Sequence, residues 1–210
     1  MLKCRNLQFT NATYFNDPFD CHPGLINFSD VPKAKCEIWP PDIIRLLESD
    51  PYKKLREQTW LCSLSKVYDE LLMWSYYGGH KGVCVGLDME MADKYLSEKW
   101  CGGNTIGISK VEVQYKDIIN KPDYFRYIGL KSLFHYQLST KAKAWEHEKE
   151  VRLLMDDPNY GFIPAAEPKG LRKSPEDAID YKEIRFYLPM KKEYFCSLYI
   201  GATMGKDNED

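Results

Sequence analysis

The chain has 210 residues, of which 44% are hydrophobic and 14% aromatic, and its 29 basic and 31 acidic residues leave a net charge of −2. This length and apolar content suffice to bury one sizeable core, which excludes disorder of the whole chain and favours one domain over two. The balanced charge gives no electrostatic reason for binding to nucleic acid or to a membrane surface, so we expect neither.

Alternating and β-branched stretches predict a mixed, mostly antiparallel central sheet of about six strands flanked by helices. The strand signals lie at residues 6–10, 59–65, 82–88, 106–115, 148–155, 181–188 and 195–202. Helix signals occupy residues 41–48, 51–58, 69–77, 89–99 and 122–138, with a helical turn at 141–146. Because strands and helices mix without strict alternation, we predict one α+β domain over residues 1–210, with a long loop at 156–180.

The termini and the cysteines indicate a cytoplasmic protein. The start, MLKCRNLQFT, has no apolar signal-peptide region, and no apolar run approaches the ~20 residues that span a bilayer. The seven cysteines form no C-x-x-C pair, which argues against a zinc site and a disulfide framework. Free thiols fit a reducing cytosol. The first strand begins almost at Met1, so we expect an upstream element to be missing.

A polar loop follows the first strand, with Asn16, Asp17, Pro18, Asp20 and His22 close together. Asn and Asp side chains bond their own backbone in turns and proline fixes the bend, so we favour a structural turn. The alternative is a loop that places Asp17, Asp20 or His22 in a functional site, of which a metal-dependent nuclease is the most remote version.

Two further segments combine polar and aromatic residues. In the strand at 59–65, Ser63 and Ser65 share one face, as at the wall of a cleft or on a solvated surface. The helix at 69–77 carries Trp74 and Tyr77, and it leads into glycines that match no phosphate-binding fingerprint. We expect most side chains of this helix to pack in the core.

The segment from Lys141 to Arg152 is the most informative. If a strand starts at Glu148, then Glu148, Glu150 and Arg152 share one face, and Trp145 lies beside them. Two carboxylates at this spacing repel each other unless a cation such as Arg152 or Lys141 lies between them. One interpretation is a surface ion-pair ladder; the other is a carboxylate pair for acid–base or oxocarbenium chemistry.

Together these segments resemble a bacterial family, domain of unknown function 2971. The resemblance rests on FTNATYFNDPFD, CSLS, MWSYYGGHKGVCVGLD, the pattern K-x-x-x-W-x-x-E-x-E-x-R and SLYIGATM, in the same order over nearly the whole chain. It implies a prokaryotic, intracellular protein and assigns no activity. Two departures stand out: the chain lacks the family's initial Leu-Tyr-x-Tyr segment, and it has Tyr76 where many members have histidine.

The Ser-x-Ser and Glu-x-Glu patterns are also similar to those of arginine-modifying ADP-ribosyltransferases. That resemblance implies an NAD-dependent effector of a toxin or phage-defence system, with catalytic Glu148 and Glu150. The alternative is a non-catalytic module that binds a small molecule or a partner protein. Under the first hypothesis NAD is the substrate, and its binding residues are Ser63, Ser65, Trp74, Tyr77, Lys141, Trp145, Arg152, Asn16 and Asp17.

Overall fold

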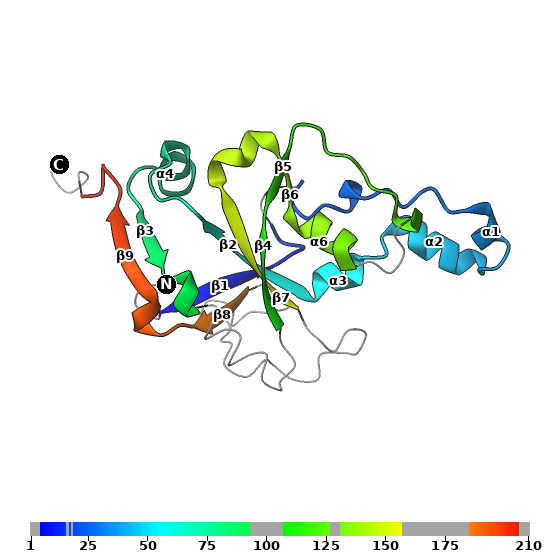
Figure 1. Cartoon of the computed structure of the whole chain (residues 1–210), viewed down its shortest axis with the longest axis horizontal. Coiled ribbons are helices and arrows are strands. Elements are labelled where there is room, and N and C mark those ends of the chain that lie inside the picture. Colours follow the sequence, from blue (N-terminus) through cyan, green and yellow to red (C-terminus); the bar gives the residue numbers. More distant parts are fainter. Residues whose placement is uncertain are drawn as a thin grey trace.

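The centre of the structure is a five-stranded sheet in the order β4-β7-β2-β1-β8 (Figure 1). The computed structural model describes residues 5–15, 17, 19–92, 107–126, 131–156 and 185–205. The α+β class is confirmed, although this sheet has five strands and every neighbouring pair is antiparallel. Its strands are β1 (Asn6–Asn11), β2 (Thr59–Ser65), β4 (Gly107–Glu112), β7 (Glu150–Asp156) and β8 (Arg185–Pro189).

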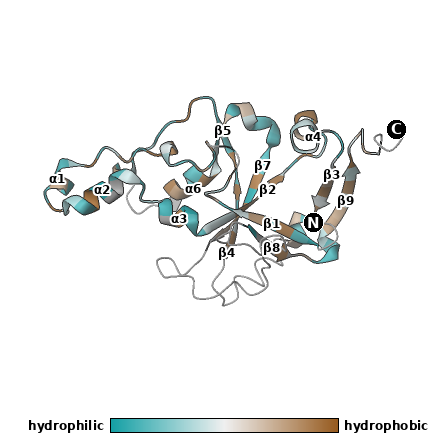
Figure 2. Cartoon of the chain, turned by 180° about the vertical axis from the view of Figure 1, so that it is seen from behind, coloured by the Kyte–Doolittle hydropathy of each residue, from teal (hydrophilic) through white to brown (hydrophobic). Residues whose placement is uncertain are grey.

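Two small sheets accompany the central one. β3 (Val83–Leu87) pairs antiparallel with β9 (Phe195–Ile200), and Figure 2 shows both as largely hydrophobic. β5 (Gln114–Lys116) pairs parallel with β6 (Thr140–Ala142). The second pair positions the candidate site, because β6 contains Lys141 and places it in the cluster described below.

The helices lie around the sheet and beyond one end of it. α1 (Lys33–Cys36) and α2 (Pro41–Ser49) extend from the end opposite to β3 and β9 (Figure 1). The others are α3 (Lys53–Glu57), α4 (Leu71–Gly78), α6 (Lys131–Ser139) and the 3-10 helices η1 (Pro23–Leu25), η2 (Tyr124–Arg126), η3 (Lys143–Glu148) and η4 (Lys192–Tyr194). Within the described ranges, no helix is long and apolar enough to cross a membrane.

The central sheet buries a core on each face because side chains alternate along a strand. One core collects Leu7, Phe9, Trp60, Leu153 and Met155. The residues between them point to the other face, where Leu61 and Leu154 pack against the helix α6 and the loop after β1. The same alternation places four polar residues on this second face, next to Leu61 and Leu154. They are Ser63, Ser65, Glu150 and Arg152.

Several predicted elements have different bounds. The strand expected from residue 148 starts at Glu150, because Glu148 ends η3 and Lys149 turns the chain in a left-handed conformation (φ 42°). The N-cap of α4 is Glu70, and not Asp69. The strand at 106–115 is split into β4 and β5, and the helix at 122–138 is represented by η2 and α6. Three predicted stretches fall mostly or partly outside the described residues. They are the helix at 89–99, the loop at 156–180 and the start of the strand at 181–188.

Gly201, directly after β9, allows a close approach of two backbone segments. A Cβ atom there would lie 2.3 Å from the carbonyl oxygen of His80, and the Gly201 amide donates to the Gly82 carbonyl at 2.9 Å. The clash would be with backbone atoms, which move less easily than the end of a flexible side chain. We therefore expect Gly201→Ala to lower the free energy of unfolding by about 1–3 kcal/mol in a urea titration. Gly78→Ala is the matched control, because its Cβ meets nothing within 4 Å. Equal stability of the two variants would contradict the prediction.

Candidate functional site

Arg152 is the centre of a buried charged cluster on the second face of the sheet. Its side chain is 0% exposed. Nε and Nη2 donate to the two carboxylate oxygens of Glu150 at 2.8 and 3.1 Å, and Nη1 and Nη2 donate to those of Asp20 at 2.8 and 2.6 Å. Nη1 also donates to the Leu138 carbonyl at 2.7 Å. All five guanidinium N–H groups are therefore used, as the burial of such a charge requires.

Lys141 is the second cation of the cluster and lies among three carboxylates. Its Nζ is 2.7 Å from Glu148 Oε2, 2.9 Å from Glu150 Oε2 and 3.5 Å from Asp20 Oδ2. The side chains of Lys141, Glu148 and Glu150 are 9%, 4% and 5% exposed. Two cations thus face three carboxylates in a nearly solvent-free volume, and this pairing offsets part of the cost of burying the charges.

Glu148 enters this cluster from η3 and not from the strand. Its Oε1 accepts a 2.5 Å hydrogen bond from the Tyr77 hydroxyl, and its backbone carbonyl accepts from Ser65 Oγ at 2.8 Å. The left-handed turn at Lys149 reverses the chain between the two glutamates. Glu150 then starts β7, and its amide donates to the Tyr115 hydroxyl at 2.8 Å. The turn lets both carboxylates reach Lys141 although only Glu150 lies in the sheet.

The cluster sets the protonation of its members. Burial alone would raise the pKa of Glu150, but the charge and hydrogen bonds of Arg152, the charge of Lys141 and a bond from Ser63 lower it to about 2. Burial lowers the pKa of Lys141, and the attraction of Glu150 and Asp20 raises it above its ordinary value. Glu150 is therefore a fixed anion at neutral pH. Cys62 is no nucleophile, because burial and Glu150 raise the pKa of its thiol to about 12.

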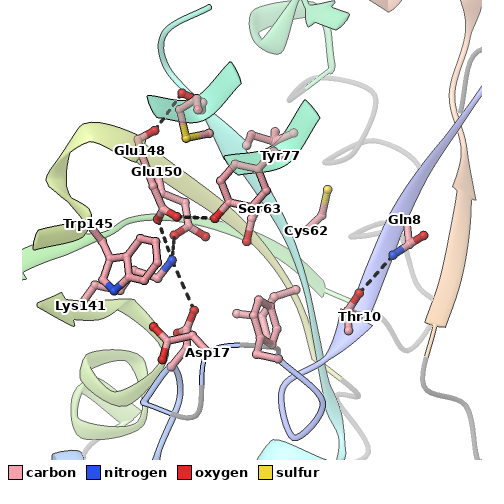
Figure 3. Close-up of a pocket in the computed structure, with 16 residues that line it drawn as sticks. Gln8, Thr10, Asp17, Cys62, Ser63, Tyr77, Lys141, Trp145, Glu148 and Glu150 are labelled. Carbon is pink, nitrogen blue, oxygen red and sulfur yellow. Dashed lines mark hydrogen bonds and ion pairs between the residues drawn. The ribbon is translucent and has the colours of Figure 1, made fainter. Parts of the chain in front are cut away.

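A cavity of about 610 Å³ opens on this cluster, and Figure 3 shows Tyr77, Trp145 and the two glutamates around it. Ser65 lies directly opposite Glu150 in the β2–β7 ladder, and Ser63 lies opposite Arg152. The aromatic rings of Phe15, Tyr77 and Trp145 contribute apolar walls. The polar residues on its surface are Gln8, Thr10, Asp17, Asp20, Ser63, Ser65, Lys141, Glu148 and Glu150.

Most residues proposed from the sequence meet at this cavity. Those that line it are Asp17, Ser63, Ser65, Tyr77, Lys141, Trp145, Glu148 and Glu150. Arg152 lies behind Glu150 and does not line the cavity. Trp74 does not line it either, since its Nε1 donates to the Tyr68 carbonyl at 2.7 Å. Asn16 falls outside the described residues. The roles of all these residues stay predictions.

Asp20 is the member of the cluster that the NAD hypothesis left out, and the sequence named it only in the alternative interpretation of its loop. The turn bonds expected for its loop are present: the Phe19 amide donates to Asp17 Oδ1 at 2.9 Å, and the Gly24 amide donates to His22 Nδ1 at 3.0 Å. The Asp20 side chain, by contrast, is 2% exposed and binds Arg152, 132 positions away. A local pattern carries no signal for such a contact. Gln8 and Thr10, which alternate along β1, were also missed.

No group of three or more His, Cys, Asp or Glu side chains placed to hold a metal ion occurs in the described part of the chain. Asp17 and His22 are engaged in the turn bonds given above, and Asp20 is bound to Arg152. We therefore propose no metal centre in this loop.

Fold and site define an α+β protein with a buried ionic cluster under a partly aromatic cavity. Residues 73–153 match the model of the family described as "Protein of unknown function (DUF2971)", so the resemblance to this family is confirmed. The matched segment contains Tyr77, Lys141, Trp145 and both glutamates of the cavity. Comparison with curated proteins and with solved structures gives no match. The similarity to ADP-ribosyltransferases stays a hypothesis.

Proposed function

We propose that the cavity binds NAD and cleaves the bond between nicotinamide and ribose. In this reaction the C1′–N bond breaks, its electron pair leaves with the pyridine nitrogen, and the ribose passes through a state that resembles an oxocarbenium ion. Water or an acceptor group then forms the new bond at C1′ and loses a proton. The observation that carries the proposal is the ionised carboxylate of Glu150, held by Arg152 and Lys141 at the cavity.

A fixed anion stabilises the positive charge that develops on the ribose during the reaction. Because both oxygens of Glu150 are already held by hydrogen bonds, the carboxylate is oriented before the ligand arrives and needs no reorganisation during the reaction. The proposed role of Glu150 is therefore to stabilise the positively charged ribose. Ser63 and Ser65, on the opposite strand, are suited to bind ribose hydroxyls. The rings of Tyr77 and Trp145 offer apolar walls for nicotinamide.

Glu148 has a second role in the proposal. It already accepts a hydrogen bond from a hydroxyl, that of Tyr77, which is the interaction that would orient an acceptor hydroxyl or a water molecule. An activity of this kind depletes NAD or modifies a target, which fits an effector of a toxin or phage-defence system.

Incubation of the full chain with NAD tests the proposal, with released nicotinamide and remaining NAD measured together. We expect nicotinamide release, and a rate about tenfold lower for Ser63→Ala, because Ser63 also bonds the charged Glu150 carboxylate and such a hydrogen bond contributes about 1.5 kcal/mol. Ser109→Ala is the matched control, because Ser109 is exposed on β4 and lies outside the cavity. Intact NAD after incubation, with no binding heat in calorimetry, would sink the proposal.

A non-catalytic ligand- or partner-binding module is the second candidate. It is favoured by the saturation of the cluster: the oxygens of both glutamates accept bonds from Tyr77, Lys141 and Arg152. Carboxylates bound in this way form a polar wall of the cavity, and their hydrogen-bond partners are already in place. NAD that binds and stays intact would support this candidate over the first.

A further inference from the structure

A second cavity adjoins the first. It has a volume of about 450 Å³, and Asp17, Asp20, Lys141 and Trp145 line both cavities. The loop after β1 and the strand β6 therefore form a wall with a cavity on each side. A ligand that extends past these four shared residues would occupy both spaces.

The two cavities differ in charge. Four carboxylates and one ammonium group line the first, those of Asp17, Asp20, Glu148, Glu150 and Lys141. The second shares Asp17, Asp20 and Lys141 but has neither glutamate, and it gains Lys121 and His22, so its two carboxylates are matched by two ammonium groups. Lys121 is exposed and forms an ion pair with no carboxylate in the described ranges. The first cavity thus favours a positively charged group, and Lys121 offers an anionic group of the same ligand a cation in the second.

The second cavity also has an aromatic rim. The Phe19 ring is 74% exposed, although large apolar side chains gain free energy when they are covered. Phe19 and Trp145 both line this cavity, together with the buried Leu25. An exposed ring beside a cation is suited to bind a planar base that carries phosphate nearby.

We propose that the second cavity holds the adenosine diphosphate part of a dinucleotide, with the base against Phe19 and the diphosphate near Lys121. The cationic nicotinamide ring and its ribose then enter the first cavity, beside Glu150. This inference rests on the proposed function and assigns a separate site to the adenosine diphosphate part of its substrate. The site selects a dinucleotide with a positive ring and a negative diphosphate over a simple nucleoside.

Calorimetry of the full chain with three probes tests the inference. The probes are NAD, ADP-ribose, which lacks the positive ring, and nicotinamide riboside, which lacks the phosphates. We expect NAD to bind more tightly than either part. We expect Lys121→Ala and Phe19→Ala each to weaken the binding of ADP-ribose and NAD about tenfold (about 1.4 kcal/mol) and to leave the riboside unchanged, because the first removes a phosphate contact and the second a stacking surface.

Matched controls separate the site from general surface effects. Lys116→Ala removes an exposed lysine from β5, and Tyr14→Ala removes a ring that is 54% exposed; neither residue lines a cavity. Both should bind all three probes like the parent. ADP-ribose that binds equally to parent, Lys121→Ala and Phe19→Ala, or that binds to none of them, overturns the inference.

The result also distinguishes this inference from the proposed function. If Lys121→Ala loses affinity for ADP-ribose while the parent leaves NAD intact, the second cavity is established and the cleavage reaction is refuted. If the parent and both variants cleave NAD with the same KM, cleavage is established and the assignment of the second cavity is wrong.

Discussion

Replacing Arg152 by methionine is expected to lower the free energy of unfolding by about 3–5 kcal/mol, because the change leaves Asp20 and Glu150 buried with Lys141 as their remaining cation. For a chain of this size, the loss corresponds to a decrease of roughly 6–20 °C in the melting temperature. Thermal unfolding followed by circular dichroism measures it. Arg152→Lys keeps the charge but loses the planar fork that binds both carboxylates, so we expect an intermediate decrease.

Arg45→Met is the matched control for this prediction. Arg45 pairs with Asp42 at 3.2 Å on α2, but its side chain is 75% exposed, and exposed pairs contribute at most about 1 kcal/mol. Melting temperatures of Arg152→Met and Arg45→Met within a degree or two of each other would contradict the view that the buried cluster holds the loop after β1 against the sheet.

The sequence predicted the parts of the site that lie close together along the chain. Alternation in β2 and β7 correctly placed Ser63 and Ser65 on one face, and Glu150 and Arg152 are the ion pair expected at that spacing. The pair is buried, with the Arg152 side chain 0% and the Glu150 side chain 5% exposed. The Trp145 ring lies beside the neighbouring Lys141, whose Nζ is 5.8 Å from the ring centre.

The remaining features depend on contacts that local patterns do not encode. Asp20 reaches Arg152 because β1, β2 and β7 are neighbours in the sheet, and the preference for turns in its loop concealed this contact. Glu148 was assigned to the strand because the left-handed turn falls on Lys149, where no glycine signals it. The same turn brings both glutamates to one cation, so the missed feature is also the one that shapes the site.

Glu150 has a structural role, and the proposed function adds a chemical one. Its bonds to Arg152 and Lys141 stabilise the fold, and the same bonds keep it ionised at the cavity. A carboxylate held only for catalysis would be replaceable with little loss of stability, or with a gain. We therefore expect Glu150→Gln to lower the free energy of unfolding at neutral pH by about 3–5 kcal/mol, because Arg152 and Lys141 would then face one carboxylate fewer.

The pH dependence of stability is the sharpest test of Glu150. Its pKa in the folded chain is about 2, against an ordinary value of 4.5, so between these values the unfolded chain binds more protons. The stabilisation is complete above about pH 5 and is lost as the pH falls toward 2. The difference between the two pKa values corresponds to about 3 kcal/mol in the free energy of unfolding. About 2 kcal/mol of this stabilisation is lost at pH 3.

Urea unfolding at pH 7 and pH 3 measures this effect as the change in the difference between parent and Glu150→Gln. We expect the parent's advantage to shrink by about 2 kcal/mol at pH 3, because the stabilisation by the Glu150 anion is lost in the parent and is absent from the variant at both pH values. Glu112→Gln is the control, because Glu112 pairs with Lys66 on the surface with its side chain 64% exposed, and its difference from the parent should stay nearly constant. An advantage over Glu150→Gln that is the same at both pH values would mean that Glu150 is not the fixed anion on which the proposed chemistry depends.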